Sequence, residues 1–171
     1  DGASNDAVAP KDGDKIVDAS GNLAQIVGGK AVALDEEGKA TDKVVKVKND
    51  KGEDVDFAAG VTLLQLKVTH KYKAGVKWSD GEPVKAADML LGNKVSCAKD
   101  SGATSFFGCD RIGSYDAKDV DGGIEAVTTY IAGYQPPTFF LPGGFGIPSH
   151  QVVVSEGANK GKKLAEVATA D

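Results

Sequence analysis

Polar and apolar side chains alternate regularly in the stretch from Thr62 to Lys73. This period of two is typical of a half-buried β-strand, in which successive side chains point to opposite faces. We therefore predict one long strand here, with its apolar face turned toward a core. The apolar face carries Leu64, Leu66, Val68, His70 and Tyr72, and the polar face carries Gln65, Lys67, Thr69, Lys71 and Lys73.

Short apolar segments separated by turn residues precede this strand. The segments are 15–17, 23–27, 31–34 and 43–48, and each runs into a turn rich in glycine, aspartate or asparagine. Glycine in such turns supplies the positive φ that a tight hairpin needs. The pattern predicts a hairpin-rich meander. The small polar residues 1–14 that come before it predict a flexible lead-in.

Beyond the long strand the chain turns twice and then enters a helix. Gly75 lies in the first turn, and residues 79–81 form the second. The helix is expected from about residue 84 or 85, with Asp88 in its first turn accepting free backbone N–H groups. Its expected buried face is Ala87, Leu90, Leu91, Val95 and Ala98.

The rest of the chain predicts a second hairpin and a short helix. Strands at 110–115 and 124–132 flank an acidic turn at 116–123, and a helix begins within 164–170. Taken together, the elements predict the α+β class, with a mainly antiparallel twisted sheet and one or two packed helices. Residues 15–171 are expected to form a single domain.

Composition and charge exclude some partners. The chain has 171 residues, a formal net charge of −5 and 20 basic residues that are scattered rather than clustered. A nucleic-acid-binding surface needs a dense basic patch, so no nucleic-acid partner is expected. The sequence also has no apolar run of the roughly 18–20 residues that span a bilayer.

The sequence offers no pattern for catalysis or metal binding. It contains no G-x-S-x-G motif, no Walker A loop and no close cysteine–histidine pair. The acidic turn lacks the alternating oxygen ligands of a calcium loop, because Lys118 occupies one of the positions. His70 is expected as a buried structural histidine, with a ligand or base role as the alternative. We therefore predict a protein that is not an enzyme, with no catalytic residues, cofactor or metal site.

The two cysteines, Cys97 and Cys109, flank a segment with the composition of a loop. Two thiols without further nearby ligands do not make a zinc site, and their spacing does not fit a CxxC redox motif. A disulfide between them is the favoured interpretation, with two independent thiols as the alternative. A disulfide would indicate an oxidising compartment outside the cytoplasm.

Residues 134–148 are rich in aromatic residues, proline and glycine. Such a stiff segment either covers the sheet as irregular packed structure or lines a cleft. The sequence alone favours packing and leaves ligand contact open. No ligand-binding residue is assigned.

One run carries a family resemblance: HKYKAGVKWSDGEPVKAAD. It resembles the most recognisable motif of the family 5 extracellular solute-binding proteins, which are the peptide, nickel and opine receptors of bacterial ABC importers. The matching positions, in order and spacing, are Gly75, Trp78, Asp80, Gly81, Pro83, Ala87 and Asp88. Later stretches that also fit a branch of this family are CAKDSGATSFFGCDRI, TTYIAGYQPPTFFLP and GIPSHQVV.

The chain departs from the family pattern at three positions and in length. His70 replaces a usual phenylalanine, Lys73 replaces a frequent arginine, and Lys85 replaces the hydroxyl residue that usually caps the helix. Losing that cap costs about 1 kcal/mol, which Asp88 is expected to offset in part. Family members are much longer and have two lobes, and the motif lies in a subdomain of the first lobe.

The resemblance implies a function for the parent protein rather than for this stretch alone. It implies a fragment of an extracytoplasmic, membrane-anchored receptor that captures peptide-like ligand and delivers it to an ABC permease. The partners implied are the rest of the receptor, the permease, the peptide in the full-length protein and a lipid anchor on the parent chain. The alternative is a stand-alone extracellular structural or interaction module without a small-molecule ligand.

Overall fold

The computed structural model describes residues 2–101, 106, 108–136, 146–153 and 157–167. Within them the chain forms strands β1 (Gly2–Val8), β2 (Lys15–Val17), β3 (Leu23–Val27), β4 (Lys30–Leu34), β5 (Ala40–Val44), β6 (Lys46–Lys48), β7 (Asp54–Asp56), β8 (Leu63–Lys73), β9 (Ile112–Val120) and β10 (Gly123–Tyr130). The helices are α1 (Ala86–Cys97) and α2 (Leu164–Val167), with short 3-10 turns at Lys99–Ser101 and Cys109–Arg111.

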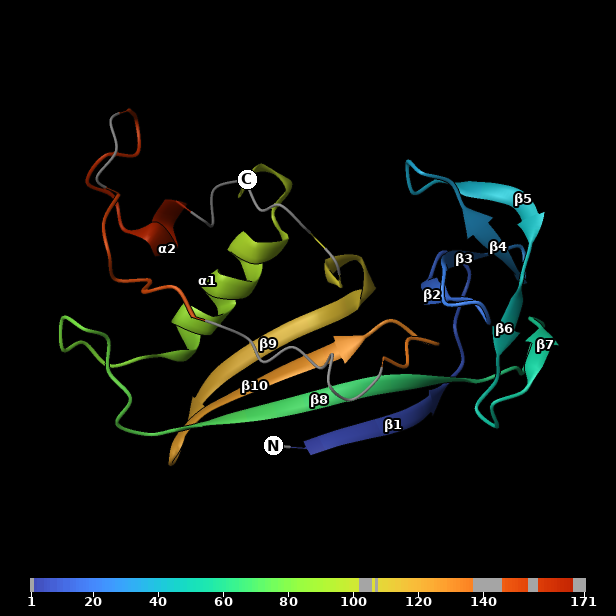
Figure 1. Ribbon diagram of the computed structural model, residues 1–171, viewed down its shortest axis with the longest axis horizontal. Coiled ribbons are helices and arrows are strands. Elements are labelled where there is room, and N and C mark those ends of the chain that lie inside the picture. Colours follow the sequence, from blue (N-terminus) through green and yellow to red (C-terminus); the bar gives the residue numbers. More distant parts are fainter. Residues whose placement is uncertain (1, 102–105, 107, 137–145, 154–156, 168–171) are drawn as a thin grey trace.

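All strand pairs within the sheets are antiparallel, so the predicted α+β class with a twisted antiparallel sheet is confirmed. The larger sheet has the strand order β1-β8-β10-β9, and α1 lies over one of its faces (Figure 1). A smaller sheet, β2-β3-β4-β5, and the β6-β7 pair lie at the other end of the molecule (Figure 1).

Strand β8 joins the two ends, and its predicted alternation is confirmed. Leu66 and Val68 on the apolar face are buried, whereas Lys67 and Lys71 on the polar face are exposed. The strand pairs with β1 along one edge and with β10 along the other. It therefore occupies an interior position in the larger sheet.

The predicted meander is confirmed, with one difference in strand number. Residues 43–48 form parts of two strands instead of one, because Val45 interrupts the pairing. Its backbone N–H donates to the Ala31 carbonyl oxygen at 2.9 Å. Beyond this point the chain no longer pairs with β4, and its next strand, β6, pairs with β7.

Three turns in this region have the same local structure. In each, a side-chain oxygen of the first residue accepts the backbone N–H groups two and four residues later. The first residues are Asp18, Asp35 and Asn49. The fourth residue is a glycine with φ of 87°, 78° or 85°. The predicted positive-φ glycines are thus confirmed in the turns that contain Gly21, Gly38 and Gly52.

The predicted lead-in over residues 1–14 is wrong for Gly2–Val8, which form strand β1. The register runs from Gly2 opposite Thr69 to Val8 opposite Leu63. Backbone hydrogen bonds hold this strand, and its side chains are exposed except for half-buried Val8. A strand that buries almost no side chain has no apolar alternation, so its sequence pattern does not reveal it.

Helix α1 starts where it was predicted, but its predicted buried face is partly wrong. Ala86, Asp88, Met89, Leu91 and Gly92 are buried, whereas Leu90 is 39% exposed. Ala86 and Met89 pack on the β9–β10 hairpin, against Ala117, Ile124 and Ala126. The helix is rotated from the prediction because it also turns a buried carboxylate, Asp88, toward the protein interior.

The second hairpin is confirmed, but its turn is shorter than predicted. Strands β9 and β10 pair up to Gly123 opposite Val120, so the turn consists of Asp121 and Gly122. The charged residues assigned to a long turn belong to β9 instead. Lys118 lies opposite Glu125, and their charged groups are 2.9 Å apart. Such a cross-strand ion pair stabilises the hairpin where an apolar pattern is absent.

One hydrophobic cluster joins the two ends of the molecule. Its fully buried members come from both sheets: Ile16, Ala24, Ile26, Ala31, Val47, Leu63 and Ala132. Backbone hydrogen bonds also join the two ends of the molecule. The Val17 N–H donates to the Ala132 carbonyl, and the Gly133 N–H donates to the Leu64 carbonyl. This junction forms one wall of a hollow that is described below.

Candidate functional site

The motif residues form a tight loop between β8 and α1. The Trp78 backbone carbonyl accepts the Gly81 N–H at 3.0 Å. The Trp78 backbone N–H donates to the Glu82 carbonyl at 2.8 Å. Lys77 and Pro83 form an isolated antiparallel bridge. Gly75 and Gly81 have φ of 82° and 91°, which explains glycine at both positions. The loop is therefore a small hairpin that leads into α1.

Asp88, in the first turn of α1, ties this loop to the helix and has a relative exposure of 1%. Its Oδ2 accepts the Trp78 indole N–H and the Lys85 backbone N–H, both at 2.9 Å. Its Oδ1 accepts the Ser149 backbone N–H at 2.8 Å. Burial raises the pKa of Asp88, but the hydrogen bonds from Ser149, Lys85 and Trp78 outweigh burial and lower the pKa below its ordinary value.

Asp80 makes a second, more exposed contact with the same distant segment. Its Oδ2 lies 2.8 Å from His150 Nε2 and accepts the Gln151 side-chain N–H at 2.7 Å. Its Oδ1 accepts the Glu82 backbone N–H. The His150 hydrogen bond, followed by the Glu82 backbone bond, lowers the pKa of Asp80. Two carboxylates of the motif thus hold residues 149–151.

These contacts give most of the predicted motif residues a structural role. Trp78 and Asp88 connect the loop to α1 and to Ser149, Asp80 connects it to His150, and Gly75 and Gly81 make the turns. Ala87 is exposed on α1, and Pro83 is exposed at the end of the loop. The sequence could not assign Ser149 and His150 to the site. Their partners, Asp88 and Asp80, lie 61 and 70 positions earlier in the chain, and no local pattern links them.

A third carboxylate completes the start of α1. Asp119 Oδ1 accepts the Ala86 backbone N–H at 2.9 Å, and Asp88 accepts that of Lys85. Both bonds satisfy N–H groups that a helix leaves free at its first turn. The expected compensation for the missing cap at Lys85 is therefore found, with Asp119 as an addition. Asp119 reaches the helix only through the folding of β9 beneath it.

The predicted disulfide is confirmed. Cys97 and Cys109 are bonded, with their Cα atoms 5.5 Å apart. The bond joins the last residue of α1 to the 3-10 turn before β9, so it fixes the helix to the hairpin on which it packs. A disulfide of this kind indicates an oxidising compartment.

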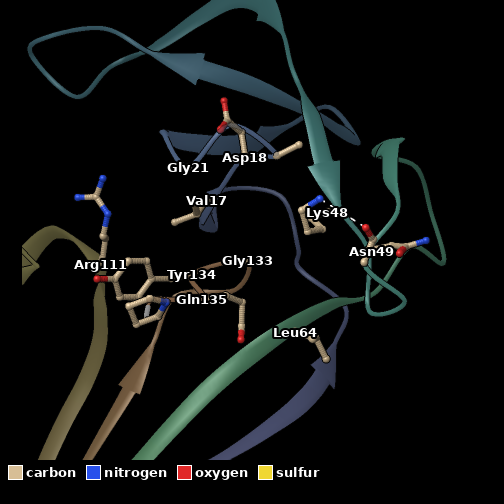
Figure 2. Close-up of a pocket in the computed structure, with 13 residues that line it drawn as sticks. Val17, Asp18, Gly21, Lys48, Asn49, Leu64, Arg111, Gly133, Tyr134 and Gln135 are labelled. Atoms are coloured by element: carbon tan, nitrogen blue, oxygen red, sulfur yellow. Dashed lines mark hydrogen bonds between the residues drawn. The ribbon is translucent and has the colours of Figure 1, made fainter. Parts of the chain in front are cut away.

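One hollow lies where the smaller sheet meets the end of the larger one. Its volume is about 450 Å³. Figure 2 shows Lys48 and Asn49 on one side of it and Arg111 and Tyr134 on the opposite side. Val17, Leu64 and Gly133 contribute to the wall between them.

An aromatic and cationic pair forms one wall of this hollow. The Tyr134 ring packs on Tyr130 with ring centroids 5.1 Å apart, and the Arg111 guanidinium lies 5.8 Å from the Tyr134 centroid. Arg111 Nη1 also donates to both carboxylate oxygens of Asp110, at 2.8 and 2.9 Å. Burial raises the pKa of Tyr130 to about 12, so this ring stays neutral at physiological pH.

Where the structure describes it, the aromatic and proline-rich segment 134–148 lines a hollow at its start and bonds to α1 near its end. Tyr134, Gln135 and Pro136 line the hollow, and Ile147 donates its N–H to the Asp88 carbonyl. Residues 137–145 lie outside the described residues.

His70 is half-buried opposite Ala126, on the sheet face that α1 covers.

In the described residues, no group of three or more histidine, cysteine or acidic residues is placed to hold a metal ion. None of the helices in the described ranges is long and apolar enough to cross a membrane.

Comparison with known proteins finds no match: no family model, no curated protein and no solved structure matches this chain.

Proposed function

We propose that this chain is part of an extracytoplasmic solute-binding protein of family 5, which captures peptide-like ligand for an ABC importer. One observation supports the proposal above the others. Two separate stretches that resemble the family, 75–88 and 147–151, contact each other through Asp88 and Asp80. Residues that match the family motif thus depend on residues of a later matching stretch, as parts of one structural unit do.

In the proposed receptor this chain supplies a rigid framework beside the binding cleft. The full-length protein captures peptide by closure of two lobes, and closure is coupled to binding only through the higher affinity of the closed state. The closed receptor then docks on the permease. A lipid anchor on the parent chain holds it at the membrane surface, and the Cys97–Cys109 disulfide suits that oxidising location.

The test compares the full-length gene product with the 171-residue chain. Isothermal titration calorimetry with di- and oligopeptides is expected to give micromolar dissociation constants for the full-length protein only. Its sequence is expected to continue into a second α/β lobe. Micromolar peptide binding by the 171-residue chain alone would contradict the proposed division of labour. A gene product that repeats this unit instead would favour the stand-alone extracellular module.

A further inference from the structure

Strand β1 is an edge strand with no neighbour on its outer side among the described strands. It pairs with β8 alone, and Figure 1 shows it as the outermost strand of the larger sheet. Its pairing runs from Gly2 to Val8 without a register shift, and residues 2–7 are exposed. The outer side of such a strand presents backbone N–H and C=O groups that can pair with another strand.

Native proteins disfavour such pairing with lysines, prolines, bulges or very short edge strands. Strand β1 has none of these features, and Asp6 is its only charged residue. The opposite edge of the sheet, β9, has a register shift beside Tyr130 and carries charges at Asp116, Lys118 and Asp119. Strands β2, β6 and β7 have three residues each, and β5 has a register shift. Of the sheet edges that the structure describes, β1 is therefore the one best suited to accept another strand.

The sequence of β1 is complementary to itself. When two copies are paired antiparallel around Asn5, Ser4 of one copy lies opposite Asp6 of the other, and Ala3 lies opposite Ala7. A serine hydroxyl donates to a carboxylate, so the facing residues are compatible and no like charges meet. The neighbouring symmetric registers pair fewer residues, and one of them sets the two Asp6 carboxylates opposite each other.

A charged residue of β8 favours the same arrangement. Ser4 lies opposite Lys67, so Asp6 of one copy would lie in a row with Ser4 and Lys67 of the other. The row spans two strand spacings, about 10 Å, and the long lysine side chain can extend past the small serine to the carboxylate. Asp6 and Lys67 are exposed, and neither forms a salt bridge within the described residues. Lys67 helps to lower the pKa of Glu125, but the ion pair of Glu125 is with Lys118.

We propose that two copies of this chain associate through β1, antiparallel and centred on Asn5, and join their larger sheets into one. Both copies use the same surface, so the assembly closes as a symmetric dimer. The features of β9 that disfavour pairing then prevent further growth of the sheet. Seven residue pairs make an interface at the small end of specific ones, so the dimer is weak.

Sedimentation velocity of the 171-residue chain between about 10 µM and 1 mM tests the association. A change from monomer to dimer is expected, with a dissociation constant on the order of 100 µM and no larger species. A monomer over the whole range overturns the proposal and leaves β1 to a partner other than this chain. A series of ever larger species also overturns it, because the proposed dimer closes.

Two charge reversals test the contact between Lys67 and Asp6. Asp6→Lys and Lys67→Asp are each expected to weaken self-association at least about tenfold, because each brings like charges together. An equal mixture of the two is expected to recover the affinity of the unsubstituted chain, because both facing pairs are then opposite in charge. Each variant keeps its own internal surroundings in the mixture, so recovery arises only from contact between chains.

Asp42→Lys is the matched control, because it makes the same charge change in β5, an exposed edge strand of the smaller sheet. It is expected to change the dissociation constant less than about twofold, since solvent screens a distant exposed charge. Equal losses in Asp6→Lys and Asp42→Lys would overturn the proposal, as would a mixture that associates no better than either charge reversal alone.

Asn5→Cys tests the register without altering these charges. In the proposed dimer this position faces its own copy, and facing residues of paired strands are close enough for a disulfide. Oxidation is expected to give at least about fivefold more covalent dimer than with Ala3→Cys, which lies on the same face but away from its own copy. Equal yields, or more dimer from Ala3→Cys, would overturn the proposal. The proposal concerns this chain alone and does not rest on the receptor function, which the peptide calorimetry of the full-length protein tests separately.

Discussion

Asp88 holds three parts of the molecule together through one side chain. Replacement by asparagine keeps its size but supplies only one accepting oxygen. Whichever way the amide turns, its NH₂ group faces a backbone or indole donor that Asp88 now satisfies. We expect Asp88→Asn to lower the free energy of unfolding by roughly 3 kcal/mol, measured by urea denaturation at pH 7.

The control for this prediction is Asp42→Asn. Asp42 is exposed, and within the described residues its carboxylate makes no hydrogen bond or ion pair, so this variant is expected to unfold like the unsubstituted chain. An equal loss of stability in both variants would mean that net charge, rather than the bonds of Asp88, is responsible.

The lowered pKa of Asp88 also predicts how its contribution depends on pH. The unfolded carboxyl has a pKa of about 3.9, and in the folded protein the hydrogen bonds outweigh burial and lower the pKa. The folded state therefore binds fewer protons than the unfolded state between these two values. The stabilisation is fully present above about pH 4 and is lost as pH falls through the folded pKa.

Urea denaturation of the unsubstituted chain and Asp88→Asn from pH 7 to pH 2 measures this effect. The difference in unfolding free energy between the two proteins is expected to stay constant down to about pH 4 and to shrink below it. A difference that is the same at pH 2 and pH 7 would show that the carboxylate charge does not contribute. The pKa of Asp80 is also lowered, chiefly by the hydrogen bond with His150. Its contribution to stability is therefore expected to be lost on acidification as well.

The β9–β10 hairpin contains two adjacent glycines that differ in their surroundings. Gly122 has φ of 90° and open space where a Cβ would lie. Gly123 has φ of 141°, and a Cβ there would clash with the Tyr72 carbonyl oxygen and lie 2.9 Å from the Ala74 nitrogen. The strand β8 therefore approaches the hairpin too closely for any side chain at Gly123.

We expect Gly122→Ala to cost about 1 kcal/mol, the price of a left-handed conformation in a residue with a Cβ. Gly123→Ala is expected to cost roughly 3 kcal/mol or more, because it also displaces backbone. Thermal and urea denaturation of the two variants side by side measure the contrast. Equal costs would mean that the hairpin moves away from β8 at little expense.

Elements with a strong local pattern were predictable from the sequence. The alternation in β8, the glycine turns of the meander and the start of α1 follow from side chains close together in the chain. Strand β1 was not predictable, because backbone pairing with β8 holds it without burying its side chains. The buried face of α1 was not predictable either, since it depends on where Asp88 finds donors in a distant segment.

The candidate site shows the same division between local and distant contacts. The turn at Asp18 follows from its sequence, and the disulfide was inferred from the loop between its cysteines. The hollow beside Tyr134 could not be predicted, because β2, β6, β8 and the segment after β10 meet there only in the folded chain. Nothing in the local sequence distinguishes Asp18 from Asp35, and only burial separates them.

At the scale of the whole molecule, the fully buried cluster around Leu63 decides how the chain unfolds. Its members belong to the smaller sheet, to β6, to β8 and to the segment after β10. Neither sheet can lose its side of this cluster without exposing the other side to water. The expectation of a single domain over residues 15–171 therefore becomes a testable statement about cooperativity.

We expect one unfolding transition, seen identically by one probe of the α1 end and one probe of the whole molecule. Fluorescence of Trp78, the only tryptophan, reports on the loop before α1, and far-ultraviolet circular dichroism reports on all strands. Leu63 is fully buried in the shared cluster, so Leu63→Ala is expected to cost about 3 kcal/mol and to shift both curves equally. If only the dichroism shifts while Trp78 fluorescence keeps its midpoint, the α1 end folds independently, and the chain consists of two cooperative units joined by β8.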